Sequence, residues 1–93
     1  MKGFSYTSLG TAIGELVDRK QTEYGDSFGK AGGVLRILYP DGIQPAAYDD
    51  MLAVVRVVDK LFRVANGSKG TESPGRDIAG YGLLLAKRHE QRK

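Results

Sequence analysis

Three basic side chains in the middle of the chain are the residues best suited to binding an anion. Arg56, Lys60 and Arg63 follow one another at spacings of four and three residues, so on a helix they form one basic line about two turns long. Such a line is typical of a solvated helix face. Val57 and Val64, however, lie between this line and the apolar stripe of the same segment, which favours an apolar surround. Within a pocket or subunit contact of that kind, the basic groups would attract a phosphate more strongly than in open water.

Few side chains in the sequence are suited to catalysis. The single histidine, His89, lies in the basic stretch at the end of the chain, where we expect it to be exposed rather than to act as a base or a metal ligand. The chain has no cysteine, and Gly29-Lys30 lacks the Ser or Thr that completes a phosphate-binding loop. We therefore assign no catalytic residue.

The basic line belongs to a long helix predicted for residues 45–67. Pro45 suits a first helical turn, Asp49 and Asp50 favour the positive N-terminal end, and Gly67 can stop the helix. Apolar residues recur along it at spacings of three and four, which predicts a core-facing stripe. The stripe consists of Met51, Val54, Val55, Val58, Leu61, Phe62 and Ala65.

Three further helices are predicted around the long one. The first covers residues 8–24, with Ser8 or Thr11 as its cap, and the second covers residues 27–38 and ends before a Pro-Asp-Gly turn. The last begins at Ser73-Pro74 and runs to about residue 90, with Gly80 and Gly82 on either side of Tyr81, where we expect another group to lie close by. No segment shows the alternation of a strand, so the predicted fold is all-α, a compact bundle of about four helices.

The composition is that of one ordinary globular domain, residues 1–93, with a basic tail from about residue 87. The net charge is +3, and much of the excess lies in that tail, so the folded part is nearly neutral and a duplex nucleic acid is a poor candidate partner. No apolar run approaches the length needed to span a membrane, and no signal-peptide pattern opens the chain, so we expect a cytoplasmic protein. At 93 residues a single core is small, and apolar residues on more than one side of the long helix predict a homo-oligomer.

Several short blocks resemble a known family when they are taken in order. They are residues 23–27 (EYGDS), 58–63 (VDKLFR), 72–73 (ES) and 77–81 (DIAGY), within a match that spans about residues 15–86. This combination resembles the small phage nucleotide-modification-associated or MazG-like domains. The resemblance implies an all-α, MazG-like fold and a role in handling nucleotides, in a virus of bacteria and hence in the host cytoplasm.

MazG-type pyrophosphohydrolases hold magnesium with paired acids, ExxE on one helix and ExxD on another, and this chain departs from that pattern. Asp50 and Asp59 are nine residues apart, on nearly opposite sides of a helix, so they cannot share one metal ion. If the chain were a hydrolase, the acids left to hold Mg²⁺ would be Asp26, Asp59, Glu72 and Asp77. We instead expect Asp59 to pair with a neighbouring Arg, Arg63 being the nearest, and Asp77 to cap the last helix.

The tyrosines inside the blocks complete the candidate site. Tyr24 and Tyr81 are ordinary core or interface residues on the simplest interpretation, but an aromatic ring beside basic groups is also what a purine and its phosphate require. The predicted ligand-binding set is therefore Tyr24, Arg56, Lys60, Arg63, Arg76 and Tyr81.

The function expected from these residues and the resemblance is capture of a small phosphorylated nucleotide without turnover and without a cofactor. Such a protein could sequester a cyclic nucleotide that a host uses as a defence signal. One alternative is a metal-dependent, MazG-like nucleotide pyrophosphohydrolase. The other is a protein-interaction module that acts on a host protein through the second apolar seam of the long helix.

Overall fold

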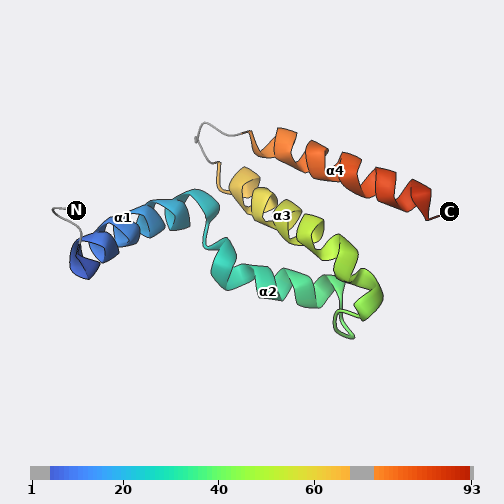
Figure 1. Cartoon of the computed structure of the whole chain (residues 1–93), viewed down its shortest axis with the longest axis horizontal. Coiled ribbons are helices and arrows are strands. Elements are labelled where there is room, and N and C mark those ends of the chain that lie inside the picture. The colour runs from blue at the N-terminus through green and yellow to red at the C-terminus, as the bar shows by residue number, and fades with distance from the viewer. Residues whose placement is uncertain (1–4, 68–72, 93) are drawn as a thin grey trace.

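The fold consists of four α-helices joined by short connections (Figure 1). The computed structural model describes residues 5–67 and 73–92. The helices are α1 (Tyr6–Tyr24), α2 (Ser27–Leu38), α3 (Tyr48–Ala65) and α4 (Pro74–Gln91), and a short 3-10 helix, η1 (Pro45–Ala47), leads into α3. No strand occurs in these described segments. The all-α fold with four helices is confirmed.

The helix ends follow from local side-chain chemistry. Ser5 caps α1 by accepting from the backbone N–H of Ser8 at 3.1 Å, and the Ser8 side chain accepts from the N–H of Ser5, which makes a reciprocal capping box. The cap is therefore neither of the two predicted residues, Ser8 and Thr11, but Ser5, three residues before the first of them. Ser73 caps α4 as predicted, accepting from the N–H of Arg76, with Pro74 at the first helical position.

Two consecutive residues in the left-handed region turn the chain between α1 and α2. Gly25 ends α1 at φ 59°, and Asp26 follows at φ 59°. A left-handed aspartate is uncommon, but here its carboxylate accepts from the N–H of Gly29 at 3.2 Å and caps α2. The sharp reversal fixes where α2 begins, so the predicted range 27–38 matches the observed helix.

Helix α3 lies at the centre and contacts each of the other helices. Helix α4 packs along it on one side and α2 on the other, whereas α1 meets α3 near one end and then extends away, as Figure 1 shows. The resulting molecule is elongated, with extents of 56 × 28 × 27 Å. No helix within the described part of the chain is long and apolar enough to cross a membrane.

The burial of α3 corrects the predicted core stripe. Val58 is 5% exposed and Ala53 is 7% exposed, and these two are the buried apolar residues of the described chain. Val55 and Leu61, predicted to be core, are 42% and 51% exposed, and Ala65 is also exposed. Val58 belongs to the predicted stripe and is buried, but α1 and α4 cover a different side of α3, the one that carries Lys60 and Arg63.

Candidate functional site

Three cations surround the ring of Tyr24, where the end of α1 meets α3. The guanidinium carbon of Arg63 lies 5.2 Å from the ring centroid, the ammonium of Lys60 lies 5.8 Å away, and that of Lys20 lies 6.0 Å away. Distances of this size are in the range of cation–π attraction. Arg63 is only 2% exposed, so it is part of the packed interior. The prediction that grouped Tyr24 with Lys60 and Arg63 agrees with these contacts. Of the two interpretations of the basic line, the solvated face holds for the exposed Arg56, whereas Lys60 and Arg63 are covered.

Long basic side chains can occupy such a position because their stems are apolar. The methylene groups of Lys60 and Arg63 pack while their charged ends meet a ring face or a carboxylate. The Lys60 ammonium lies 3.5 Å from the Asp77 carboxylate, and the Lys60 side chain is 12% exposed. Lys20 likewise lies 3.5 Å from the Glu23 carboxylate. Acidic partners therefore offset part of the positive charge around Tyr24.

Two of the predicted acidic contacts are replaced by others. Asp59 was expected to pair with Arg63, but its carboxylate accepts a hydrogen bond from the hydroxyl of buried Ser27 at 2.5 Å. Asp77 was expected to cap α4, and it does lie in the first turn, but the cap is Ser73 and the Asp77 side chain binds Lys60. Both acids thus join helices to each other: Asp59 ties α3 to α2, and Asp77 ties α4 to α3.

Asn66, just after α3, anchors the end of α1. Its side-chain amide donates to the carbonyl oxygens of Thr22 and Glu23, the latter at 3.1 Å. Gln21 donates to the Asp26 carboxylate at 2.8 Å and so braces the same corner. These bonds hold the Tyr24 ring in place against α3, and nothing in the sequence pattern pointed to Asn66.

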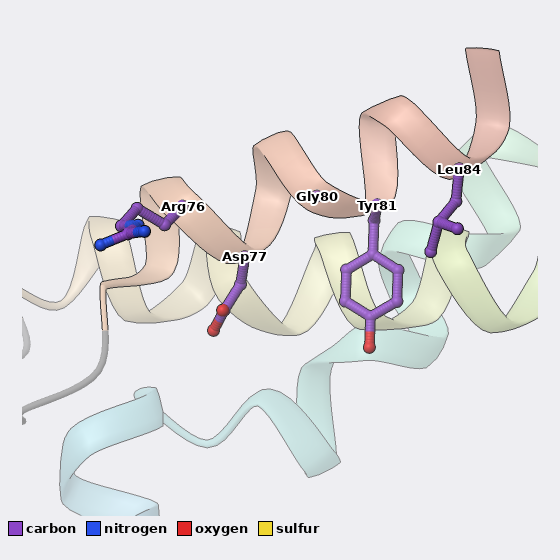
Figure 2. A pocket seen from close by; sticks show the side chains of 5 residues that line it. All are labelled: Arg76, Asp77, Gly80, Tyr81 and Leu84. Atoms are coloured by element: carbon purple, nitrogen blue, oxygen red, sulfur yellow. The ribbon is translucent and has the colours of Figure 1, made fainter. Parts of the chain in front are cut away.

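An open hollow beside this cluster is lined by residues of α4. It has a volume of about 340 Å³ and is bounded by Arg76, Asp77, Gly80, Tyr81 and Leu84. Figure 2 shows the side chains of Asp77, Tyr81 and Leu84 directed to the same side of α4, with Arg76 at the start of the row. Asp77 connects the hollow to Lys60, and Lys60 in turn lies over Tyr24. Five of the six predicted ligand-binding residues are thus joined by contacts or by a shared hollow.

The remaining predicted residue, Arg56, does not join them. It lies one turn before Lys60 on α3 and is exposed. The group expected close to Gly80 and Gly82 is not another part of the described chain, since a Cβ at either position would meet no atom within 4 Å outside the backbone of its own helix. These glycines border open space, and in the case of Gly80 that space is the hollow.

The acids proposed for a metal ion are dispersed. Within the described residues no group of three or more acidic or histidine side chains could hold a metal. Glu72, one of the four candidates, lies outside the described residues. Asp26 and Asp59 are engaged in the structural contacts already given. The absence of a cofactor remains a prediction.

A second polar cluster, centred on Asp50, was not anticipated. The carboxylate of Asp50 in α3 lies 3.2 Å from a guanidinium nitrogen of Arg88, 3.2 Å from Nε2 of His89 and 3.4 Å from Arg92. The hydrogen bond from His89, together with those from the arginines, lowers the pKa of Asp50 below its usual value, while partial desolvation opposes that shift. His89 is half-exposed as expected, yet it takes part in this cluster. The predicted basic tail is thus in large part the last turns of α4, held against the start of α3.

Comparison of the chain with protein-family models, with curated proteins and with solved structures finds no match. The resemblance to MazG-like domains therefore has no support beyond the blocks that carry it.

Proposed function

We propose that this protein binds a small phosphorylated nucleotide in the hollow along α4. Arg76 would contact the phosphate and Tyr81 would form a wall for the base. The observation that carries the proposal is that these two side chains line one open hollow of about 340 Å³, next to the Lys60–Asp77 ion pair. Small-molecule sites typically begin at roughly 300 Å³, so the hollow has room for one mononucleotide.

The ion pair offers a way to strengthen anion binding. The Asp77 side chain is 40% exposed at the edge of the hollow, and its partner Lys60 is 12% exposed behind it. A phosphate that enters beside Arg76 would draw the Lys60 ammonium toward it and compete with Asp77 for that ammonium. An arginine–phosphate contact is a charge-assisted hydrogen bond and can be bidentate, so Arg76 is the stronger of the two contacts.

The ligand set is smaller than the one expected from sequence. Arg63 is 2% exposed and lies against Tyr24, so both are better suited to hold Lys60 in position than to touch a ligand. Arg56 is exposed and has no place in the hollow. The proposed contacts are therefore Arg76, Tyr81 and Lys60.

A binding titration tests this proposal. Calorimetry would use adenosine and guanosine 5′-monophosphates, the corresponding triphosphates and the 3′,5′-cyclic monophosphates. We expect at least one of them to bind, with Arg76→Ala and Tyr81→Leu each weakening the affinity by about tenfold or more, since one such contact is worth about 1.4 kcal/mol or more. Arg36→Ala removes an exposed cation from the far end of α2 and should leave affinity unchanged. No heat of binding for any of these nucleotides at about 1 mM would reject the proposal.

We further propose that the protein binds the nucleotide without hydrolysing it. The support for binding without turnover is the chemistry of the side chains that line the hollow, which include no nucleophile paired with a base. The bound nucleotide should be recovered intact after denaturation of the protein, as judged by mass spectrometry, and binding should survive a chelator. Release of pyrophosphate that depends on magnesium, and that is lost in Asp77→Asn, would instead support the hydrolase alternative.

A further inference from the structure

The projecting part of α1 carries an apolar face that none of the other described helices covers. Leu9, Ile13, Leu16 and Val17 follow helical spacing, and they are 46%, 50%, 43% and 51% exposed. None of the residues of α1 is buried. Tyr24, further along the same stripe, packs against α3, so the face that begins as an interface inside the chain continues beyond the end of α3 into solvent (Figure 1).

Helix α1 has little to stabilise it on its own. It contains Gly10 and Gly14, and a Cβ at either would meet no atom within 4 Å, so neither glycine is required by close packing inside the chain. Glycine within a helix is unfavourable, and most helices in proteins depend on packing of an amphipathic face. A helix of 19 residues with this composition is therefore expected to need a partner surface.

A matching apolar surface lies between α2 and α3. It is a groove of about 210 Å³ lined only by apolar side chains, Val34 from α2 and Val58, Leu61, Phe62 and Ala65 from α3. Leu61 is 51% exposed there, although the helical spacing placed it in a core. The chain thus presents both an apolar helix and an apolar groove.

The accessible surface area of the chain is larger than expected for a folded monomer of its mass. The accessible surface of the chain is 7318 Å². A folded monomer of 10.1 kDa is expected to expose about 5300 Å², so the excess is roughly 2000 Å². Each subunit of an obligate homodimer loses about 1000–2500 Å² on association, which is the size of this excess.

We propose that a second copy of this chain covers these two surfaces, in a two-fold symmetric dimer in which the apolar face of α1 from each chain packs on the apolar groove of the other. Two-fold symmetry makes each copy give a helix and receive one, so both exposed surfaces are buried by a single interface. A second copy fits better than a different protein because the helix and the groove are in the same chain, and the excess area falls within the range that a subunit of an obligate dimer buries.

The test is the mass of the full chain in solution. Analytical ultracentrifugation at micromolar concentration should give about 20 kDa or a multiple of it rather than 10.1 kDa. Ile13→Glu and Leu61→Glu, one on each surface, should each shift the chain toward the monomer by at least tenfold in dissociation constant. Thr11→Glu adds the same charge to the opposite face of α1 and should leave the mass unchanged.

A second measurement covers the case in which a variant fails to fold. The melting temperature of the parent chain should rise with protein concentration, because association stabilises only the folded state. The chain has no cysteine, so Ile13→Cys and Thr11→Cys provide single thiols, and maleimide should react at least tenfold more slowly at position 13. A 10.1 kDa mass, a melting temperature independent of concentration and equal labelling at the two positions would each overturn the proposal.

Discussion

At the scale of single residues, the position of Lys60 has the most consequences. Helical spacing placed it on an outward basic line, and that interpretation implies that reversing its charge would leave stability unchanged. In the structure its ammonium lies between the Asp77 carboxylate at 3.5 Å and the Tyr24 ring. Lys60 is therefore part of the packing between α1, α3 and α4 as well as a candidate ligand contact.

Lys60→Glu should destabilise the fold by about 1–3 kcal/mol, because it places a second carboxylate beside Asp77 and against the negative face of the Tyr24 ring. Chemical denaturation monitored by circular dichroism measures the change. The matched control is Arg56→Glu, the same charge reversal one turn earlier at an exposed position, which should change stability by less than about 0.5 kcal/mol. Equal effects of the two variants would mean that the contacts of Lys60 add nothing to stability.

Asp50 should make the packing of α4 on α3 depend on pH. The hydrogen bond from His89, with further help from Arg88 and Arg92, lowers the pKa of Asp50 below its value of 3.8 in an unfolded chain. A carboxyl group whose pKa is lower when folded stabilises the fold above its unfolded pKa, and that contribution is lost as the pH falls through the folded value. Asp50→Asn should therefore lower the melting temperature at pH 7, and the difference from the parent chain should begin to shrink below about pH 4 and vanish once the pH is below the folded pKa of Asp50.

Asp49→Asn is the control for this experiment. Asp49 is the neighbouring acid in the same first turn of α3, its side chain is 80% exposed, and its carboxylate lies 3.9 Å from the guanidinium of Arg92. Its variant should show little change in melting temperature at either pH. A pH profile of Asp50→Asn parallel to that of the parent would contradict the assignment of the contribution to Asp50.

At the scale of helices, the surroundings of Gly80 and Gly82 allow a clean test of the hollow. Both are within α4, and a Cβ at either position would meet no atom within 4 Å, but only Gly80 lines the hollow. Replacing each with leucine should stabilise α4 by up to about 1 kcal/mol through helix propensity. Gly80→Leu should also fill the hollow and weaken nucleotide binding by at least about tenfold, whereas Gly82→Leu should leave it unchanged. Equal binding by the two variants would place the nucleotide elsewhere on the protein.

The positions of the helices along the chain were largely predictable from sequence, because caps and periodicity are local signals. Ser73-Pro74, the turn after α2 and the apolar period of α3 each depend on residues within a few positions of one another. The start of α1 was placed too late because Ser5 and Ser8 are both suited to cap a helix. Only the reciprocal hydrogen bonds between them show that the helix begins after Ser5.

Which side of each helix is covered could not be read from spacing alone. The apolar period of α3 predicted a core around Leu61, but burial depends on where the other helices lie, and α1 and α4 cover the side that carries Lys60 and Arg63. The same limit applies to the site: spacing within α3 grouped Lys60 with Arg63, while the contact of Lys60 with Asp77 joins residues of two helices. Asn66 and the Asp50 cluster were missed for this reason, since their partners lie about 40 positions away in sequence.

At the scale of the whole molecule, the elongated shape places the two proposed surfaces on different parts of the protein. The hollow lies along α4 and the exposed apolar face is on α1. Figure 1 shows that α1 extends away from the other helices. The joint between them is the Tyr24 cluster, which Asn66 fixes to α3. The proposed nucleotide site and the proposed dimer interface therefore use separate side chains, although one packed corner connects them.

This separation predicts that a monomeric variant should still bind nucleotide. Ile13→Glu changes the apolar face several turns of α1 before Tyr24, so its effect on the affinity of the hollow should be within about two- to threefold, as is usual for distant sites. The measurement is the same calorimetric titration, made at a concentration at which centrifugation shows the variant to be a monomer and circular dichroism shows it to be helical. A loss of affinity of tenfold or more, with helicity retained, would mean that the second copy acts on the site through the Tyr24 corner or contributes a residue to it. In that case the hollow of one chain would be only part of the binding site.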